Sequence, residues 1–446
     1  MSERFDAIVV GAGPAGEVAA SRLGQLGLRT ALVERELVGG ECAYWACIPS
    51  KTLLRPAEVR FEAQRTAGTS APEQSWSELA EYRDYMVRHL DDSNQVAGYE
   101  RDGVSVYKSQ ARFTGPGRVE VDGARLESER IIVATGSDPA VPEIPGLAEA
   151  GYWTNREATS LHEIPESVVV LGGGPVGIEL GQFLRRFGAE VTIVQRPDRL
   201  MAREDPAVGE LIGERLREEG IEVRLGSRTL QIDKQGGRRV VRLADDSTMA
   251  GDELLVATGR RPRVDGLEAL GVRVAARGVA IDGRCRAGDG VWAIGDVTGV
   301  MPFTHVGMYQ ARIVVDDIAG RSRAADYGAI PRVVFSDPEI AGVGLTEQRA
   351  RDEGIEVATA RVSLPEAIAR PWTYEKEPRG ELGLVADARH GRLVGAWAVA
   401  PLAGEWIHYA ALAIKTKTAL DVLRDSVAQF PTFSEAFLKG LEVLDV

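Results

Sequence analysis

Near its N-terminus the chain reads Asp6-Ala7-Ile8-Val9-Val10-Gly11-Ala12-Gly13-Pro14-Ala15-Gly16. The apolar run at 6–10 is typical of a strand buried in a parallel sheet, and the glycines allow a tight turn into a helix. A second strand is predicted at 30–34 and ends in Glu34. The glycines let the backbone approach a pyrophosphate, and the acid can bind a ribose hydroxyl pair. We therefore expect a dinucleotide site at Gly11, Gly13, Gly16 and Glu34.

The same unit recurs further along the chain. Residues 167–177 read Ser167-Val168-Val169-Val170-Leu171-Gly172-Gly173-Gly174-Pro175-Val176-Gly177, and a strand is predicted at 190–194. This strand is followed by Gln195-Arg196 rather than by an acid. Loss of the carboxylate removes repulsion against a 2′-phosphate, which Arg196 and the nearby Arg199 can bind. An internal repeat of this kind predicts two dinucleotides in separate domains, the second favouring NADPH over NADH. Its predicted binding residues are Gly172, Gly174, Gly177, Gln195 and Arg196.

Three further strands are predicted from apolar runs at 130–136, 254–262 and 290–296. The first two stop in tight turns, at Gly136 and at Gly259, and the third ends in Asp296 at the edge of a nucleotide site. Because these strands alternate with the two repeated units, the simplest organisation is a first domain interrupted by a second.

Two of the three cysteines lie in one stretch, which reads Gly39-Gly40-Glu41-Cys42-Ala43-Tyr44-Trp45-Ala46-Cys47-Ile48-Pro49-Ser50-Lys51. Residues five apart in an ideal helix have Cα atoms about 8.5 Å apart, whereas a disulfide tolerates roughly 7 Å. A Cys42–Cys47 bridge therefore requires distortion within 43–46, and strained bridges are the more easily reduced ones. We interpret the pair as a redox-active disulfide. The alternative is two buried cysteines that pack as small apolar groups.

The residues after Cys47 bear on its reactivity. Pro49 suits the first turn of a helix, so we expect a regular helix to begin near 49–51. The partial positive charge of that helix start and the nearby Lys51 favour the thiolate of Cys47. Cys285 has no neighbouring cysteine and is expected to be a bystander.

Length and composition limit the possible classes of protein. The 446 residues suggest two to four domains, and 44% hydrophobic with 27% charged residues is a globular composition. A net charge of −13 argues against nucleic acid or an anionic membrane as the main partner. We expect no signal peptide and no membrane span. Three cysteines do not make a disulfide framework, so the expected compartment is the cytoplasm.

Taken together, the motifs resemble the class I pyridine nucleotide-disulfide oxidoreductases over essentially the whole chain. This flavoenzyme family includes dihydrolipoyl dehydrogenase, glutathione reductase and mercuric reductase. Its C-x-x-x-x-C-x-P-S-K motif is matched from Cys42 to Lys51, and its A-x-G-D motif by 293–296. The glutamate that pairs with the motif lysine is matched by Glu179. The stretch 195–223 resembles mercuric reductase most closely.

The resemblance implies roles for these residues. FAD would bind at the first unit, with Gly40, Thr135, Gly136 and Asp296, and NAD(P)H at the second, with Gly259. Hydride would pass to the flavin and electrons to Cys47, while Cys42 would exchange with the substrate. Lys51 and Glu179 would lie near the reactive edge of the flavin.

The resemblance also implies an α/β chain with two Rossmann-like dinucleotide-binding domains and a C-terminal α+β dimerisation domain. The FAD domain comprises 1–150 and 266–326, the NAD(P) domain 151–265 and the interface domain 327–446. A homodimer is expected, because the family completes each active site with the partner's C-terminal segment, here around Phe430 and Glu435.

Departures from the family narrow the expected activity. Disulfide-reducing members carry H-P-T-x-S-E near the C-terminus, whereas this chain reads Phe430-Pro431-Thr432-Phe433-Ser434-Glu435. Phenylalanine cannot shuttle a proton, and losing a general acid/base typically costs about 10² to 10⁴ in rate. We therefore expect poor lipoamide or glutathione reduction, with Glu435 retained as a candidate catalytic residue. The chain also ends without the cysteine pair of mercuric reductase, so mercury reduction is not supported.

Two departures surround Cys42: Glu41 stands where threonine is common, and Tyr44-Trp45 lie between the cysteines. These aromatic side chains either narrow access, offer a stacking face to a planar acceptor, or belong to the core. Three functions remain open: an NAD(P)H-dependent reductase of a disulfide-type or other small acceptor, an NAD(P)H-quinone reductase that uses the flavin directly, and a non-catalytic binding or redox-sensing flavoprotein.

Overall fold

The computed structural model describes residues 2–446 and divides into two compact units. Unit 1 comprises 1–49, 81–140 and 259–326, and unit 2 comprises 50–80, 141–258 and 327–446. Each unit is therefore assembled from three separate stretches of chain. The division falls inside helix α3 (Cys47–Arg65) and helix α4 (Trp76–Met86).

Unit 1 contains a six-stranded sheet in the order β20-β21-β8-β2-β3-β4. All neighbouring strands are parallel except β20 and β21. The strands are β2 (Ala7–Val10), β3 (Thr30–Val33), β4 (Val104–Tyr107), β8 (Ile131–Val133), β20 (Arg286–Gly288) and β21 (Val291–Ala293). The predicted strands at 6–10, 30–34, 130–136 and 290–296 are thus found in one sheet. Their runs of buried apolar residues fit a parallel sheet covered on both faces.

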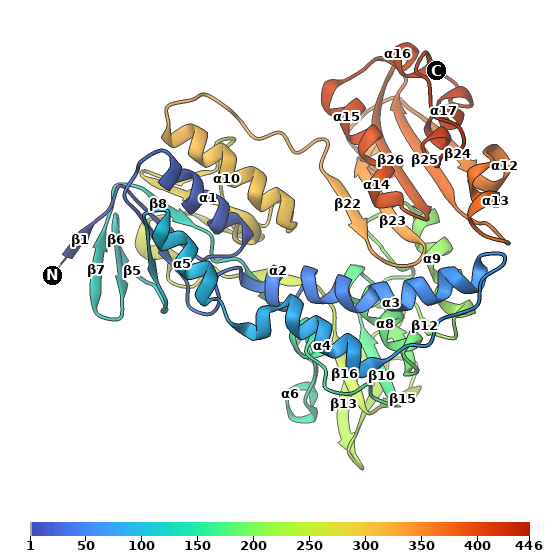
Figure 1. Ribbon diagram of the computed structural model, residues 1–446, viewed down its shortest axis with the longest axis horizontal. Helices are drawn as coiled ribbons and strands as arrows, with labels where there is room; N and C mark the ends of the chain where they lie inside the picture. The colour runs from blue at the N-terminus through green and yellow to red at the C-terminus, as the bar shows by residue number, and fades with distance from the viewer. Residues whose placement is uncertain (1) are drawn as a thin grey trace. The chain divides into compact units, whose positions relative to one another are not determined.

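Helices α1 (Pro14–Gln25) and α10 (Thr304–Ile318) pack side by side next to this sheet (Figure 1). Helices α2 (Gly40–Tyr44) and α5 (Ser93–Arg101) belong to the same unit. A second sheet, in the order β1-β7-β6-β5, is formed by β1 (Ser2–Arg4), β5 (Arg112–Gly115), β6 (Arg118–Val121) and β7 (Ala124–Glu127).

Unit 2 repeats the first motif in a four-stranded parallel sheet in the order β12-β11-β10-β16. Its strands are β10 (Ser167–Leu171), β11 (Glu190–Val194), β12 (Glu222–Arg224) and β16 (Glu253–Val256). Helix α8 (Pro175–Arg186) connects β10 to β11, and α9 (Pro206–Glu218) leads to β12. An antiparallel meander follows, formed by β13 (Thr229–Gln235), β14 (Arg238–Leu243) and β15 (Thr248–Gly251).

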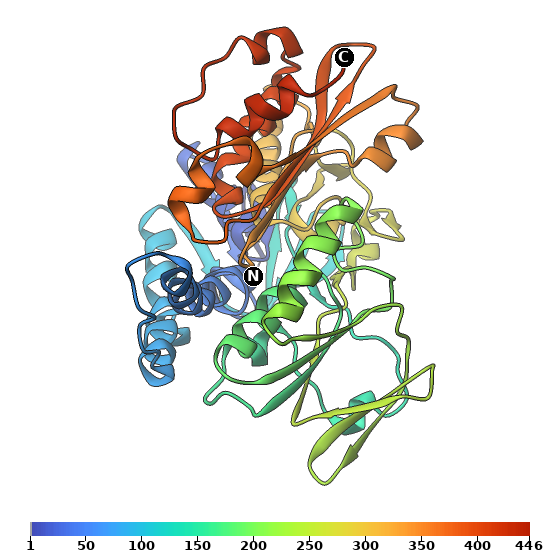
Figure 2. The same cartoon turned by 90° about the vertical axis from the view of Figure 1, so that its right-hand side faces the viewer.

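The C-terminal part of unit 2 is a five-stranded antiparallel sheet in the order β22-β23-β26-β25-β24. Its strands are β22 (Pro331–Val334), β23 (Glu339–Gly344), β24 (Val357–Ser363), β25 (Glu381–Asp387) and β26 (Arg392–Ala400). Helices α15 (His408–Thr416) and α17 (Glu435–Glu442) pack against this sheet (Figure 2). The sheet and helices bury one apolar cluster between them.

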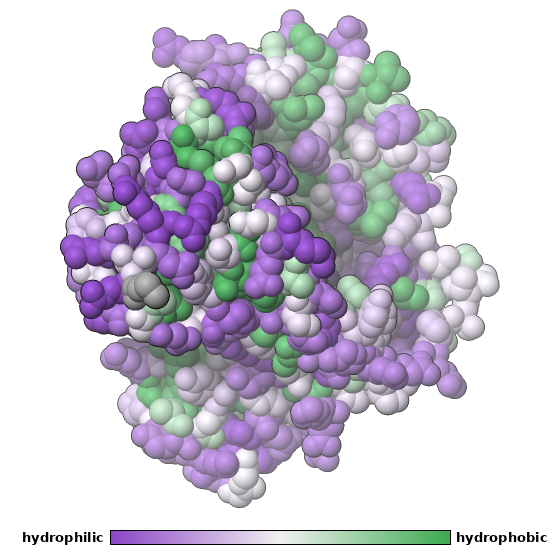
Figure 3. Space-filling view, turned by 60° about the vertical axis from the view of Figure 1, so that its left-hand side comes forward, coloured by the Kyte–Doolittle hydropathy of each residue, from purple (hydrophilic) through white to green (hydrophobic). Residues whose placement is uncertain are grey.

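The surface agrees with the globular composition. On the face shown in Figure 3, hydrophilic side chains predominate and hydrophobic ones are scattered among them. No helix within residues 2–446 combines the length and the apolar character that crossing a membrane requires.

Candidate redox active site and its two dinucleotide sites

Two glycines of the first turn, Gly11 and Gly16, have no room for a Cβ atom. Gly11 has φ +102°, and a Cβ added there would lie 2.2 Å from the carbonyl oxygen of Ala134. A Cβ on Gly16 would lie 1.8 Å from the carbonyl oxygen of Gly11. At Gly13, which precedes α1, an added Cβ would meet nothing within 4 Å. The backbone at the start of α1 can therefore be approached closely, as a pyrophosphate at a helix N-terminus requires.

Glu34 lies at the end of β3 and is held by this turn. Its Oε2 accepts a hydrogen bond from the Ala12 backbone N–H at 2.7 Å, and its Oε1 accepts one from Glu36 N–H at 2.7 Å. Each carboxylate oxygen keeps a further lone pair, so the group still suits a ribose hydroxyl pair.

The other predicted FAD residues gather at the same edge of unit 1. Gly40 has φ +61°, and a Cβ there would lie 2.7 Å from Gly13 Cα, which shows how closely α2 approaches the glycine turn. Thr135 Oγ1 donates to the carbonyl oxygen of Arg263 at 2.8 Å, and Gly136 has φ +73°. Asp296 follows β21 and accepts a hydrogen bond from Ser137 Oγ at 2.6 Å. The close backbone approach here is of the kind that a dinucleotide site needs, and the assignment of these residues to FAD stays a prediction.

The two cysteines are separated by a break between helices. Helix α2 ends at Tyr44, and Trp45 has non-helical dihedral angles (φ −136°, ψ 1°) before α3 begins at Cys47. The distortion expected within 43–46 is therefore present. The sequence predicted that this helix begins near 49–51, whereas it begins two residues earlier, at Cys47. Pro49 therefore lies within the first turn, where its missing N–H costs no hydrogen bond.

Both sulfur atoms contact one hydroxyl group. Thr304 Oγ1 lies 3.3 Å from Cys42 Sγ and 3.5 Å from Cys47 Sγ, and both cysteines are half-buried. The hydrogen bond with Cys47 raises the pKa of the Cys42 thiol, and burial and the charge of Cys47 raise it further. Thr304 acts in the opposite direction by donating a hydrogen bond to Cys42. The pair therefore gives up its second proton far less readily than its first.

The aromatic residues between the cysteines have different environments. Tyr44 is buried, its hydroxyl donates to the carbonyl oxygen of Val38 at 3.1 Å, and the Arg88 guanidinium lies 5.7 Å from its ring centre. Tyr44 is therefore a core residue and offers no stacking face to an acceptor. Trp45 is half-buried, with its ring centre 5.7 Å from that of Tyr44.

Glu41 faces two arginines that sequence reasoning missed. Its carboxylate lies 4.0 Å from the Arg260 guanidinium and 3.8 Å from that of Arg263. Arg260 also lies 3.8 Å from Asp296, and Arg263 pairs with Asp138 at 2.6 Å. The basic run after Gly259 in the sequence was the available signal for both arginines.

The second glycine turn repeats the first one in unit 2. A Cβ on Gly172 would lie 2.4 Å from the carbonyl oxygen of Ala257, and one on Gly177 would lie 1.9 Å from that of Gly172. At Gly174, as at Gly13, an added Cβ would meet nothing within 4 Å. The structure brings these three glycines together with the end of β11. Gly259 directly follows Thr258, whose backbone N would lie 3.2 Å from a Cβ on Gly172, and its role in cofactor binding stays a prediction.

The residues after β11 are neutral and then basic. Gln195 is buried, its Oε1 accepts from Gly173 N–H at 2.8 Å, and its Nε2 donates to the carbonyl oxygen of Arg199 at 3.2 Å. Arg196 is exposed. The Nε atom of Arg199 is buried and has no hydrogen-bond partner within the described residues.

Lys51 and Glu179 form an ion pair in unit 2. Lys51 Nζ lies 2.6 Å from Glu179 Oε2, and Glu179 Oε1 accepts from Phe335 N–H at 2.9 Å. Lys51 Nζ also lies 4.7 Å from the Phe335 ring centre. Since Glu179 is buried, its charge would be costly without these two donors.

The C-terminal motif has a local structural role. Glu435 Oε2 accepts a hydrogen bond from Thr432 N–H at 3.1 Å at the start of α17. Phe433 is buried against Tyr374, whereas Phe430 is 75% exposed. The catalytic role suggested for Glu435 stays a prediction.

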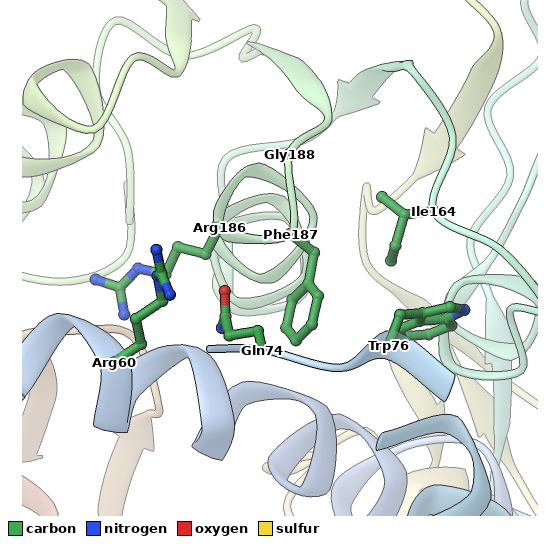
Figure 4. Close-up of a pocket in the computed structure, with 7 residues that line it drawn as sticks. All are labelled: Arg60, Gln74, Trp76, Ile164, Arg186, Phe187 and Gly188. Atoms are coloured by element: carbon green, nitrogen blue, oxygen red, sulfur yellow. The ribbon is translucent and has the colours of Figure 1, made fainter. Parts of the chain in front are cut away.

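A separate surface pocket of about 480 Å³ lies in unit 2 (Figure 4). Trp76, Phe187 and Ile164 line one part of it, and Arg60, Gln74 and Arg186 another. Arg186 is engaged by Glu219 at 2.7 Å and by Asp337 at 2.9 Å. The pocket contains no nucleophile, so we do not count it as a redox site. No cluster of three or more His, Cys, Asp or Glu side chains among residues 2–446 could hold a metal ion.

Comparison with known proteins shows the family to which the chain belongs. Residues 5–311 match the family Pyridine nucleotide-disulphide oxidoreductase, and residues 330–440 match its dimerisation domain. A mercuric reductase of Staphylococcus aureus is 33% identical over 97% of this chain and 81% of its own length. A dihydrolipoyl dehydrogenase of Thermus scotoductus is 35% identical over 99% of this chain and 97% of its own.

Among solved structures, the HOCl-induced flavoprotein disulfide reductase RclA from Escherichia coli matches with a TM-score of 0.88 and 28% identity. The match covers 98% of this chain and 100% of that one. The same reductase is known as a Cu(II) complex. With two dinucleotide-binding domains, a dimerisation domain and these relatives, the chain is a FAD-dependent NAD(P)H oxidoreductase and belongs to the pyridine nucleotide-disulphide oxidoreductases.

Proposed function

We propose that the chain reduces a small disulfide with electrons from NADPH, through the Cys42–Cys47 pair. One observation supports this more than any other: the two sulfurs share the Thr304 hydroxyl at 3.3 and 3.5 Å. Two thiols held this close can form a disulfide within the active site and exchange it with an acceptor. Bound FAD supplies the chemistry that turns a hydride into an electron pair for the cysteines.

The chain's own residues bind and orient the reactants in this proposal. The first glycine turn, with Glu34 and Asp296, holds FAD, and the second holds the nicotinamide cofactor. Cys47 is the flavin-side thiol and Cys42 exchanges with the acceptor. Lys51 supplies a positive charge for the reduced flavin, and its ion pair with Glu179 fixes the position of that charge.

The preference for NADPH rests on charge at the end of β11. Gln195 leaves no carboxylate to repel a 2′-phosphate, and the exposed Arg196 guanidinium can pair with one. The half-buried Arg199, with its unpartnered Nε, adds a second cation close by in sequence.

The acceptor is a small disulfide other than glutathione or lipoamide, because Phe430 stands where those reductases use a histidine. We propose that the protein works as a homodimer in the cytoplasm, with the partner's C-terminal segment lining each site. An acceptor whose thiols are good leaving groups needs little help from a general acid, so aromatic disulfides are the first compounds to screen.

Anaerobic titration of the FAD-loaded protein with NADPH tests the proposal. We expect a long-wavelength absorption band after two electrons, which reports a Cys47 thiolate beside oxidised FAD. Simple bleaching of the flavin would show that the cysteines are bypassed, and the quinone-reductase alternative would replace the proposal.

Steady-state assays then separate the possible acceptors. Cys42→Ser should abolish turnover of an aromatic disulfide and largely spare reduction of a quinone. Cys285→Ser is the matched control, since Cys285 is buried outside the site and should leave both rates unchanged. Cu(II) is included as an acceptor because the E. coli relative forms a Cu(II) complex. Disulfide turnover that survives Cys42→Ser would contradict the proposal.

A further inference from the structure

The Thr304 hydroxyl lies beside both cysteine sulfurs, and no sequence motif predicted it there. Thr304 is the first residue of α10, and its Oγ1 contacts Cys42 Sγ at 3.3 Å and Cys47 Sγ at 3.5 Å. A threonine has one hydroxyl hydrogen, so it donates to only one sulfur at a time and accepts from the other. When it donates to Cys42, the thiol of Cys47 can donate to Oγ1.

This arrangement matters because the reduced pair retains one proton. Burial and the neighbouring Cys47 raise the pKa of Cys42, so two adjacent thiolates are disfavoured. The sulfur that carries the charge is the nucleophile, and the sulfur that carries the proton is inert. Turnover therefore needs a path for the proton between the two sulfurs, while the C-terminal segment offers Phe430 in place of a histidine.

We propose that Thr304 is a catalytic residue that relays the proton between Cys42 and Cys47. This inference rests on the proposed thiol–disulfide function. In the relay, Cys42 gives its proton to Thr304 Oγ1 while the Thr304 hydroxyl gives its own to the Cys47 thiolate. The hydroxyl is unchanged, and the negative charge has moved to Cys42.

The exchange that follows balances in electrons and protons. The Cys42 thiolate attacks an acceptor R–S–S–R′, a Cys42–S–R bond forms, and R′S⁻ leaves and takes a proton from water. As Cys47 attacks the Cys42 sulfur, it gives its proton to Thr304 Oγ1, and the Thr304 hydroxyl gives its own proton to the departing RS⁻, which leaves as RSH. The pair is oxidised to its disulfide by two electrons, and the acceptor is reduced to two thiols.

Charged groups on the elements around the pair have other partners. On α2, the Glu41 carboxylate lies 3.8 Å from Arg263 and 4.0 Å from Arg260. On α3, Lys51 pairs with Glu179. On α10, His305 is exposed and its ring lies 5.3 Å from that of Phe303. His305 is the only one of these with an ordinary pKa near neutral pH, so it is the alternative base that the test must separate.

The test is the pH dependence of alkylation in FAD-loaded protein whose cysteines have been reduced with dithiothreitol. Iodoacetamide reacts with the thiolate, and mass spectrometry identifies the modified cysteine. Thr304→Val removes the hydroxyl with little change of shape. It should slow Cys42 alkylation at neutral pH about tenfold and move the profile to higher pH, because a hydrogen bond to a charged group is worth roughly one pKa unit. Thr304→Ser keeps the hydroxyl and should stay within about twofold of the wild type.

Several outcomes would overturn the relay. A wild-type profile in Thr304→Val would show that the hydroxyl is not used, and a slow Thr304→Ser would show that packing matters instead. His305→Asn should leave the profile unchanged, and a shift there would assign the base to His305. Thr304→Ala gives a second hydroxyl-free variant if the valine variant loses FAD. Alkylation needs neither NADPH nor an acceptor. The result of this test therefore does not depend on whether the proposed disulfide reduction is correct.

Discussion

The two glycine turns of this chain have the same backbone design and differ in charge. In the first, Glu34 Oε2 accepts from Ala12 N–H at 2.7 Å, and in the second, Gln195 Oε1 accepts from Gly173 N–H at 2.8 Å. Both side chains are buried at the end of the second strand of their unit. An oxygen acceptor at this position is therefore enough to tie the strand end to the glycine turn, whether or not it carries a charge.

The neighbouring residue explains why an amide suits the second turn. In the first turn, Glu36 N–H donates to the other carboxylate oxygen of Glu34 at 2.7 Å. The residue at the same offset in the second turn is Pro197, which has no N–H. The Gln195 amide instead donates to the carbonyl oxygen of Arg199. Charge at this position can thus change without loss of the turn, which leaves it available to discriminate between cofactors.

The largest effects are expected from the glycines that both turns share. Gly11→Ala and Gly172→Ala should each lower the free energy of unfolding by about 3 kcal/mol or more, because the new Cβ would lie 2.2 or 2.4 Å from a carbonyl oxygen at a positive φ. Thermal and denaturant unfolding of FAD-loaded protein measures the loss. Gly174→Ala, measured without a nicotinamide cofactor, is the matched control, since its Cβ meets nothing within 4 Å. If this control loses as much stability, the steric account of the turns is wrong.

The charge difference between the turns predicts a change of cofactor preference. Gln195→Glu should raise the KM for NADPH about 10- to 100-fold, because a carboxylate beside a 2′-phosphate costs roughly 1.4 to 2.7 kcal/mol, while the KM for NADH should change little. Steady-state kinetics with both cofactors measures the ratio.

The reciprocal variant, Glu34→Gln, is the control for the first turn. It should preserve folding, since the amide oxygen can still accept from Ala12 N–H, and should weaken FAD binding about tenfold. An unchanged NADPH to NADH ratio in Gln195→Glu would count against the assignment of this position to cofactor choice.

A smaller effect is expected at the exposed cation of the second turn. Arg196→Gln should raise the KM for NADPH about two- to fivefold, because an exposed ion pair is worth at most about 1 kcal/mol. The effect should shrink at high salt, where exposed charges are screened. Arg228→Gln, on the connection between β12 and β13, is a control of equal charge change. If the KM for NADH rises by the same factor, Arg196 does not act on the 2′-phosphate.

Local signals in the sequence were enough to predict the strands at both turns, because a buried apolar run followed by glycines and a helix is one contiguous pattern. The helix start was predicted at 49–51 rather than at Cys47, since proline is tolerated throughout the first turn. Thr304 could not be predicted, because it lies 257 residues from Cys47 along the chain and meets it only through the return of α10. The core position of Tyr44 also depends on a distant segment, around Arg88.

The smallest expected effect tests a further difference between the two helices. Helix α1 has an acid in its first turn, Glu17, whereas α8 has none. An acid there normally stabilises a helix, but burial raises the pKa of Glu17 despite a hydrogen bond from Tyr99 at 3.3 Å. Its folded pKa lies above the unfolded one, so the ionised form costs stability above the folded pKa and the cost disappears as pH falls towards the unfolded value.

Glu17→Gln keeps an acceptor for Tyr99 and removes that charge. It should stabilise the FAD-loaded protein at neutral pH by up to about 1 kcal/mol and lose this advantage in mild acid. Denaturant unfolding at several pH values measures the difference. A variant less stable than the wild type at neutral pH would mean that the helix dipole outweighs burial in α1, and that the absence of an acid in α8 is a disadvantage.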